Sequence, residues 1–286
     1  MSAPLGILGG SGLYALDELS DVEELDLDTP FGAPSAPLVL GTWNGVRVAF
    51  LARHGRGHVL LPGEVPYRAN LWALRSLGVE RVVSVSAVGS LREECAPGDF
   101  VLPDQFVDRT RGGRARTFFG DGVVAHVPMA DPVDAVTVAA LAAAAEGLDV
   151  RVHVGGTYVC IEGPQFSTRA ESEFHRAQGF ALVGMTNATE ALLAREAGLA
   201  YASVCMVTDW DCWRSHDDDV DVEAVLAVMR RNLAHARDLL ARALPALAAL
   251  GPSPWRGIAR AGLLTDPARV PDEAWRRLEP LLGPKP

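Results

Sequence analysis

The sequence predicts an α/β fold with one domain, and two observations lead to this prediction. Short apolar runs alternate along the chain with segments whose apolar residues recur at helical spacing, which is the pattern of strands connected by helices. No shift in composition divides the chain before about residue 250, so we expect residues 1–250 to form one domain. From Gly251 onward, Pro, Gly, Trp and mixed charges predict a loosely structured C-terminal extension over residues 251–286.

The individual elements follow from these patterns. The apolar runs predict strands at Leu5–Leu8, Leu38–Leu40, Val46–Leu51, Arg81–Ala87, Phe100–Leu102, Val152–Ile161, Ala181–Met185 and Ala200–Thr208. Helical spacing predicts helices at Pro66–Leu77, Pro132–Ala145, Arg169–Ala177, Glu190–Ala197 and Val222–Leu247. The last helix follows the acidic run Asp217–Asp219, and carboxylates favour a helix N-terminus.

Composition excludes several classes of protein. The 286 residues include 26 Lys and Arg against 36 Asp and Glu, giving a formal net charge of -10. This surplus of acid argues against a nucleic-acid surface, which needs clustered cations to neutralise phosphates. The 4 cysteines are scattered, which excludes a disulfide-dense secreted scaffold and suits a reducing compartment. The N-terminus carries no basic region, and no apolar run is long enough to span a bilayer, so we expect a cytoplasmic protein without membrane contact.

A glycine-rich turn, Gly9-Gly10-Ser11-Gly12, follows the first predicted strand. Main-chain amides in such a turn can converge on an anion, and a serine hydroxyl adds a donor. The same residues match the dinucleotide pattern G-x-G-x-x-A, but a nicotinamide site also needs a full helix and then a strand that ends in an acid. The acidic segment Asp17–Asp28 leaves no room for that helix, so a phosphate-sized anion or a structural turn is favoured.

A second candidate anion site is Arg53-His54-Gly55-Arg56-Gly57-His58, which follows a predicted strand. Arginine presents a planar fork that matches phosphate oxygens, and α/β folds place ligands at strand ends. His54 and His58 do not predict a metal pair, because the intervening glycines disfavour a helix and no third ligand stands nearby. A solvated basic loop is the alternative.

Two further turns carry small or aromatic residues. Ser86-Ala87-Val88-Gly89-Ser90 is another small-residue turn after a strand, where hydroxyls and amides could complete a phosphate cradle. In the segment 162–171, Ser167 or Thr168 with Glu171 resembles a helix capping box. Capping does not explain Phe166, whose ring could stack on a flat heterocycle.

The predicted strand Ala200–Thr208 ends in acids, Asp209 and Asp211. Burial at a pocket rim would raise the pKa of such a carboxyl, as general-acid chemistry near neutral pH requires. Helix capping or solvated loop acids are the alternative. The nearby cluster of Asp211, His216, Asp217 and Asp219 lacks the glycine of a calcium loop and the spacing of a zinc site, so we predict no metal.

Taken together, these motifs resemble the 5′-methylthioadenosine phosphorylase family, which stands beside the trimeric purine nucleoside phosphorylases. The resemblance covers about residues 5–247 and rests on blocks in matching order: Gly-Ile-Leu-Gly-Gly-Ser-Gly-Leu (6–13), Thr-Pro-Phe-Gly (29–32), Ala-Arg-His-Gly-Arg (52–56), Gly-Ser-Leu-Arg-Glu-Glu (89–94), Pro-Gly-Asp-Phe-Val (97–101), Asp-Gln-Phe-Val-Asp-Arg-Thr (104–110), Glu-Gly-Pro-Gln-Phe-Ser-Thr-Arg-Ala-Glu-Ser (162–172) and Thr-Asp-Trp-Asp-Cys-Trp (208–213). It implies a nucleoside phosphorylase domain with a central mixed sheet flanked by helices, assembled as a homotrimer, with trimers pairing into hexamers left open.

The resemblance also implies a reaction, in which inorganic phosphate as co-substrate releases a purine and a ribose 1-phosphate without a cofactor, in purine and methionine salvage. It implies a phosphate site at Ser11, Arg53, His54, Ser86, Ala87 and Thr186, with Ser86 standing where the family often carries Thr. It further implies a sugar contact at Met185, a base pocket at Phe166 and Ser167, and His126 lent by a neighbouring subunit to the 5′ side.

Physical reasoning then distinguishes among substrates. A neutral carboxyl at Asp209 can accept a hydrogen bond from the N6 amino group of adenine and donate one to N7, with Asp211 in support. A 6-oxopurine would favour an amide such as Asn at this position. The resemblance agrees at Ser167, since the related 6-oxopurine phosphorylases carry a Glu nearby. Val222, Val225 and Leu226 share a helix face that suits a methylthio group, although they could equally be core residues.

One departure from the family pattern is Asn187-Ala188-Thr189-Glu190, where Pro often precedes the Glu. The favoured hypothesis is phosphorolysis of 5′-methylthioadenosine, with Asp209, Arg53 and His54 as catalytic residues. The alternatives are a phosphorylase for 5′-methylthioinosine or ordinary purine nucleosides, a non-catalytic nucleoside-binding protein, and a nicotinamide-linked oxidoreductase.

Overall fold

The computed structural model describes residues 4–10, 13, 18–214 and 222–286, with the backbone alone at residues 222, 224 and 225. The described strands are β1 (Leu5–Gly9), β2 (Ser20–Leu25), β3 (Leu38–Trp43), β4 (Val46–Ala52), β5 (Arg81–Ser90), β6 (Phe100–Leu102), β7 (Gln105–Asp108), β8 (Val152–Val154), β9 (Thr157–Cys160), β10 (Leu182–Gly184) and β11 (Ala200–Asp209). The helices are α1 (Tyr67–Ser76), α2 (Ala135–Ala144), α3 (Arg169–Ala177), α4 (Asn187–Glu196), α5 (Val222–Ala249), α6 (Ile258–Ala261) and α7 (Asp272–Leu282), with a 3-10 turn at Pro267–Arg269.

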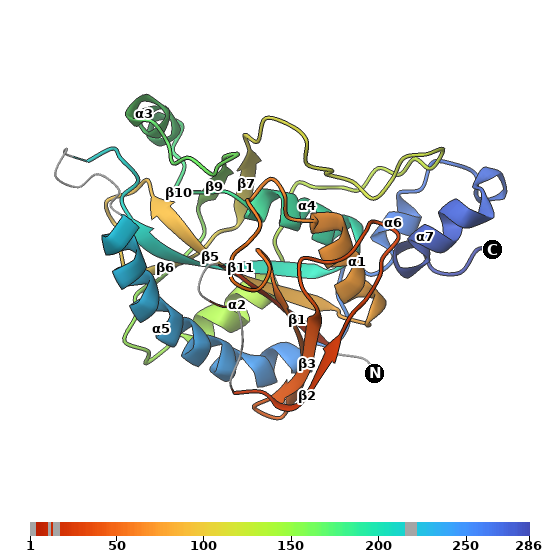
Figure 1. The fold of residues 1–286 in the computed structure, drawn as a ribbon, viewed down its shortest axis with the longest axis horizontal. Helices are drawn as coiled ribbons and strands as arrows, with labels where there is room; N and C mark the ends of the chain where they lie inside the picture. The colour runs from red at the N-terminus through yellow and green to blue at the C-terminus, as the bar shows by residue number, and fades with distance from the viewer. Residues whose placement is uncertain (1–3, 11–12, 14–17, 215–221) are drawn as a thin grey trace.

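One mixed sheet runs through the molecule (Figure 1). Its centre is parallel, because β1 lies between β4 and β5, and β11 pairs with the opposite edge of β5. Antiparallel strands β2 and β3 extend one side, and β10 joins β5 in the antiparallel sense. The carboxyl ends of β1, β4, β5 and β11 therefore meet at one edge of the sheet, where α/β folds place their ligands.

Helices cover both faces of the sheet, which confirms the predicted α/β class with a central mixed sheet. Helices α1 and α4 pack on one face with Val82 and Tyr201, while α2 and α5 pack on the other with Val83 and Ala202. Neighbouring residues of one strand thus enter opposite cores, as the alternation of side chains along a strand requires. The central strands are buried on both faces, which explains their near-continuous apolar sequences.

The observed elements differ from the predicted ones where the sequence pattern was weak. The segment predicted as one strand over Val152–Ile161 forms two, β8 and β9, because Gly155 and Gly156 adopt positive φ values of 90° and 105° between them. Strands β2 and β7 were not predicted. Helix α4 begins at Asn187, earlier than the predicted Glu190, and the acidic run Asp217–Asp219 lies outside the described residues.

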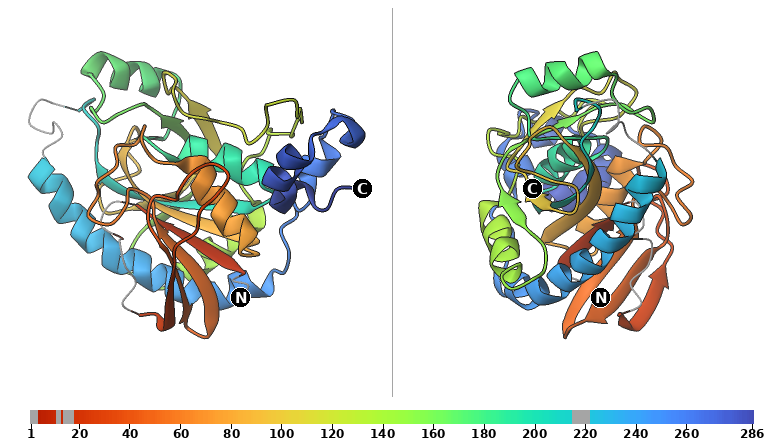
Figure 2. Two further views of the ribbon diagram at one scale, coloured as in Figure 1. Left: turned by 45° about the vertical axis from the view of Figure 1, so that its right-hand side comes forward. Right: turned by 90° about the vertical axis from the view of Figure 1, so that its left-hand side faces the viewer.

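The prediction of a loosely structured C-terminal extension is wrong. Residues 251–286 form α6 and α7 at one end of the molecule, on the right in Figure 1 and in the left panel of Figure 2. Trp275 and Leu278 of α7 are buried in the same core as Leu71 and Leu74 of α1. The Trp72 indole donates a hydrogen bond to the Arg277 carbonyl at 2.8 Å, which ties α1 to α7. Apolar burial of this kind orders a segment despite its Pro and Gly content.

Within the described residues, no helix combines the length and apolar character needed to cross a membrane.

Candidate active site

A cavity of about 450 Å³ opens at the carboxyl edge of the sheet, a volume typical of small-molecule sites. Its walls come from the loop after β4, the last part of β5, the segment before α3, the β10–α4 junction, the end of β11 and the first turns of α5. The lining residues are Arg53, His54, His58, Val59, Leu60, Leu61, Pro62, Ser86, Ala87, Val88, Gly89, Ile161, Pro164, Phe166, Ser167, Val183, Gly184, Met185, Thr186, Thr208, Asp209, Asp211, Leu226 and Met229.

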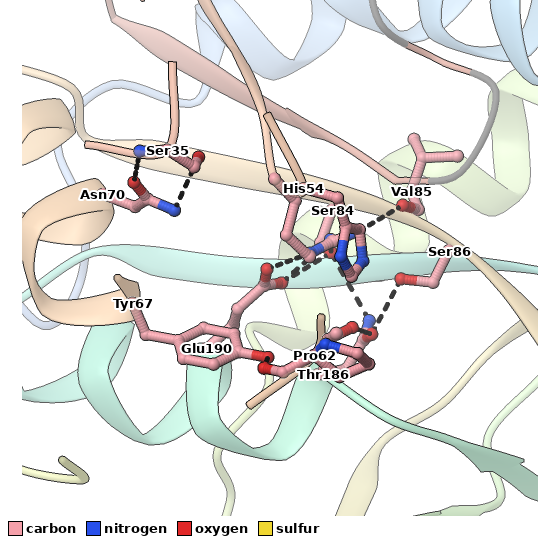
Figure 3. A network of polar contacts seen from close by, with 12 residues as sticks. Ser35, His54, Pro62, Tyr67, Asn70, Ser84, Val85, Ser86, Thr186 and Glu190 are labelled. Atoms are coloured by element: carbon pink, nitrogen blue, oxygen red, sulfur yellow. Dashed lines mark hydrogen bonds and ion pairs between the residues drawn. The ribbon is translucent and has the colours of Figure 1, made fainter. Parts of the chain in front are cut away.

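Arg53, which lines this cavity, forms a buried ion pair with Glu190. Figure 3 labels its partners Glu190, Ser84 and Val85. The Nε and Nη2 atoms of Arg53 both donate to the Glu190 carboxylate, Nη2 also donates to the Ser84 hydroxyl, and Nη1 donates to the Val85 carbonyl at 3.0 Å. Burial alone would lower the pKa of Arg53, but the opposing carboxylate raises it above the ordinary value, so the guanidinium stays charged. The planar edge of the Arg53 guanidinium, predicted to face phosphate, therefore faces Glu190. The described contacts use four of its five N–H hydrogens, so one hydrogen on Nη1 remains for a ligand.

Two hydroxyls line the cavity beside this ion pair. Ser86 belongs to β5, and Thr186 is the N-cap residue of α4. Both hydroxyls donate to the side-chain oxygen of the buried Asn187, at 2.7 Å for Ser86 and 2.9 Å for Thr186. Because Thr186 is the N-cap residue of α4, the positive end of the helix dipole lies at this wall and favours a bound anion.

His54 and His58 form a stacked pair on the loop after β4, with ring centroids 4.4 Å apart. The Nδ1 atom of His54 lies 2.9 Å from the Leu60 carbonyl, so Nδ1 carries the hydrogen of the neutral ring. Burial and the neighbouring Arg53 lower the pKa of His54 to about 4. His54 is therefore neutral near pH 7 and contributes hydrogen bonding without charge.

Asp209 ends β11 on the opposite wall. Its carboxylate accepts hydrogen bonds from the Thr208 hydroxyl at 2.7 Å and from the Asp211 amide at 2.8 Å. Burial raises its pKa to about 6, in spite of these two donors. A side chain at Gly89 would meet an Asp209 oxygen at 2.9 Å from its Cβ, so this close approach of β5 and β11 requires glycine. Burial also raises the pKa of Asp211.

An apolar wall continues from Asp209. Met185 and Leu226 line it, and Phe166 lies at the rim with 51% of its surface exposed. A side chain at Gly163, which has a φ of 71°, would collide with the Met185 sulfur, so glycine allows Met185 to approach the Phe166 segment. The predicted capping box is confirmed: the Thr168 hydroxyl accepts from the Glu171 amide while the Glu171 side chain accepts from the Thr168 amide at the start of α3.

Comparison with known proteins matches residues 4–245 to the family model described as the phosphorylase superfamily. The chain is 50% identical over 283 residues to an S-methyl-5′-thioadenosine phosphorylase of Geobacter sulfurreducens, covering 99% of each chain. Among solved structures it is similar to a methylthioadenosine phosphorylase from an Antarctic soil metagenomic library, with 45% identity, TM-score 0.91 and 98% and 99% of the two chains covered. A Schistosoma mansoni methylthioadenosine phosphorylase in complex with adenine matches with 39% identity, TM-score 0.84 and coverage of 91% and 98%.

The chain belongs to the phosphorylase superfamily.

The family resemblance drawn from the motifs is thus confirmed, and the phosphorylase brings most of the predicted site residues into one cavity. Three predicted positions cannot be placed: Ser11 and the side chains of Val222 and Val225 lie outside the described parts of the structure. His126 is described and does not line the cavity of its own chain. It is exposed, and its amide donates to the Gly262 carbonyl at 2.9 Å, beside α6.

The cavity also involves residues that the motifs did not single out as site residues. Glu190 pairs with Arg53, Asn187 accepts hydrogen bonds from Ser86 and Thr186, and Gly89 and Met229 line the cavity. The signal for Glu190 was present, because an arginine at the end of a buried strand needs a carboxylate partner. Nowhere in the described ranges do three or more His, Cys, Asp or Glu side chains gather as a metal ion would require.

Proposed function

We propose that this phosphorylase cleaves 5′-methylthioadenosine with inorganic phosphate, giving adenine and 5-methylthioribose 1-phosphate, and so serves purine and methionine salvage as a pentosyltransferase. The observation that carries the proposal is the arrangement of one cavity: hydroxyls and an arginine on one wall, and a buried carboxyl of raised pKa on the other. The names of the relatives support it, since several are S-methyl-5′-thioadenosine phosphorylases.

The chemistry follows from the positions of the two walls. Phosphate held near Arg53, His54, Ser86, Ala87 and Thr186 attacks the anomeric carbon, a C–O bond forms, and the bond from that carbon to N9 of the base breaks. Positive charge develops on the sugar ring, which the anion stabilises, and negative charge develops on the base. A protonated Asp209 donates its hydrogen toward N7 and thereby neutralises the leaving group.

Adenine is favoured over hypoxanthine because Asp209 in its protonated form offers one acceptor and one donor side by side. These match the N6 amino group and N7 of adenine, whereas a 6-oxopurine presents an acceptor in place of the amino group. Phe166 at the rim supports stacking on the base, and Ser167 and Asp211 complete this side of the pocket. Met185 and Leu226 give the sugar and 5′ side an apolar surface that suits a methylthio group.

Three further properties belong to the same proposal. Phosphate is a co-substrate, and the reaction needs no cofactor or metal. The active form is a homotrimer, in which the exposed His126 of a neighbouring copy reaches the 5′ side. The enzyme acts in the cytoplasm, in keeping with its 4 cysteines, none of which forms a disulfide bond in the described structure.

The decisive experiment compares initial rates for methylthioadenosine, methylthioinosine, adenosine and inosine, each with and without inorganic phosphate. We expect phosphate-dependent release of free base, fastest from methylthioadenosine. Equal or faster release from methylthioinosine or inosine would favour a phosphorylase for 6-oxopurine nucleosides. Binding without release would indicate a nucleoside sensor and overturn the proposal.

A further inference from the structure

A buried chain of hydrogen bonds runs from Glu190 to the anion wall, the side of the cavity that carries Ser86 and Thr186. Figure 3 shows the two ends of this chain, at Glu190 and at Ser86 and Thr186. Glu190, Tyr201, Ser203 and Asn187 are each at most 1% exposed, so no solvent competes for these groups. The Glu190 carboxylate can accept hydrogen bonds but cannot donate them. It therefore sets the direction of the hydrogen bonds that start from it.

The direction can be followed atom by atom. The Tyr201 hydroxyl donates to Glu190 Oε2 at 2.9 Å, which leaves the Tyr201 oxygen to accept from the Ser203 hydroxyl at 3.0 Å. The Ser203 oxygen in turn accepts from Asn187 Nδ2 at 2.6 Å. Ser84 acts in parallel, since its hydroxyl donates to Glu190 and its oxygen lies 3.4 Å from the same amide nitrogen. The nitrogen of the Asn187 amide thus points into the network.

The amide oxygen of Asn187 must then face the cavity wall. The Ser86 and Thr186 hydroxyls each have a single hydrogen, and both hydrogens are directed to this oxygen, over 2.7 and 2.9 Å. Toward the cavity these hydroxyls present lone pairs. Since His54 is also neutral and carries its hydrogen on Nδ1, its Nε2 is likewise an acceptor.

We propose that Asn187 is a positioning residue that turns the Ser86 and Thr186 hydroxyls into hydrogen-bond acceptors, so that the anion wall selects an oxyanion carrying its own proton over a fully ionised one. This inference rests on the proposed phosphorolysis and deepens it, by naming the form of the co-substrate. Inorganic phosphate near pH 7 keeps at least one P–OH group, whereas sulfate has no hydrogen to donate. A site built to accept a hydrogen bond rejects an analogue that lacks the donor, because its own acceptors are then left unpaired.

The test measures the KM for phosphate and the inhibition constant of sulfate in the wild-type enzyme and in Asn187→Ala. We expect sulfate to bind about tenfold more weakly than phosphate in the wild type. In Asn187→Ala the two hydroxyls are free to donate to either anion, so the ratio of the sulfate constant to the phosphate KM should fall about fivefold. A purely structural role would weaken both anions together and leave this ratio unchanged, which would overturn the inference, as would equal affinity in the wild type.

Two matched variants sharpen the comparison. Asn187→Asp keeps an acceptor toward Ser86 and Thr186, so the ratio should stay at the wild-type value even if both anions bind more weakly. Ser203→Ala removes the partner that orients the Asn187 amide and should give a smaller fall in the ratio. This variant also keeps the inference testable if Asn187→Ala does not fold. Titration of phosphate and sulfate into the enzyme by calorimetry gives the same ratio without turnover. The calorimetric ratio can therefore test the anion selectivity even if the enzyme does not catalyse the proposed reaction.

Discussion

The anion wall, which carries Arg53, Ser86 and Thr186, differs from the nucleoside wall, which carries Asp209 and Phe166, in how its polar groups are paired. On the anion wall, the charge of Arg53 is already balanced by Glu190, and Ser86 and Thr186 already have a partner in Asn187. On the nucleoside wall, Asp209 has no cation among its described contacts, its pKa is raised to about 6, and Phe166 is half exposed. The polar groups of the first wall are thus already satisfied by protein partners, whereas the second wall holds a buried carboxyl with no cation to balance its charge, which favours the protonated form.

The largest effect that tests this contrast should come from Asp209→Asn. The amide cannot transfer a proton to N7, so we expect kcat/KM for methylthioadenosine to fall about 10²- to 10³-fold, in the range known for loss of a general acid. The ratio of methylthioadenosine to methylthioinosine turnover should shift toward methylthioinosine. Initial rates with both nucleosides measure this, and an unchanged ratio would show that Asp209 does not recognise the base.

On the anion wall the corresponding change is Glu190→Ala. It leaves the buried Arg53 charge unpaired, so the free energy of unfolding should drop by about 3–5 kcal/mol. Urea denaturation measures this loss. The exposed pair Arg56–Glu24, with side chains 51% and 54% exposed, provides a matched control, because Glu24→Ala should change stability by less than about 1 kcal/mol. Equal effects of the two variants would contradict the description of the anion wall.

The pH dependence of catalysis should follow the protonation of Asp209 on the nucleoside wall. A carboxyl with a raised pKa is protonated below that pKa, so the general-acid form of Asp209 is lost as the pH rises through about 6. At saturating phosphate, kcat/KM for methylthioadenosine should approach a tenfold fall per pH unit above this value. The same profile for Asp209→Asn is the control, and it should lack this limb. If both enzymes give parallel profiles, the titrating group is another one.

The smallest effect should come from Phe166→Ala. Loss of a stacking partner worth about 0.5–1.5 kcal/mol should raise the KM for the nucleoside several-fold. The KM for phosphate should stay the same because the residue lies on the other wall. Thermal unfolding should shift little, since the side chain is half exposed. An increase in the phosphate KM of similar size would show that the two walls are not independent.

Much of the sheet could be predicted because its central strands are continuously apolar and buried on both faces. Strand β2 was missed because its sequence, Ser-Asp-Val-Glu-Glu-Leu, is charged and almost entirely exposed at the sheet edge. Helix α7 was missed because Pro271 and Pro280 flank or interrupt it, and its order comes from burial of Trp275 against α1, which a local pattern does not reveal.

For the site, side chains that follow strands were predictable, because the carboxyl edge of a parallel sheet brings them together. The pairing of Arg53 with Glu190 joins residues 137 positions apart in the chain, and no local motif contains both. The orientation of Asn187 depends on a chain of partners from β5, α4 and β11. Such networks emerge only when the strands and helices are packed.

The C-terminal helices carry a practical consequence for work on this enzyme. The match to the phosphorylase superfamily stops at residue 245, and a shortened protein that ends near there would keep every cavity-lining residue. It would nevertheless strip Trp275 and Leu278 from the core they share with α1 and leave the Glu80 carboxylate without Arg256. A protein truncated near residue 245 is therefore expected to expose apolar core surface and to aggregate, although it keeps the residues that line the cavity.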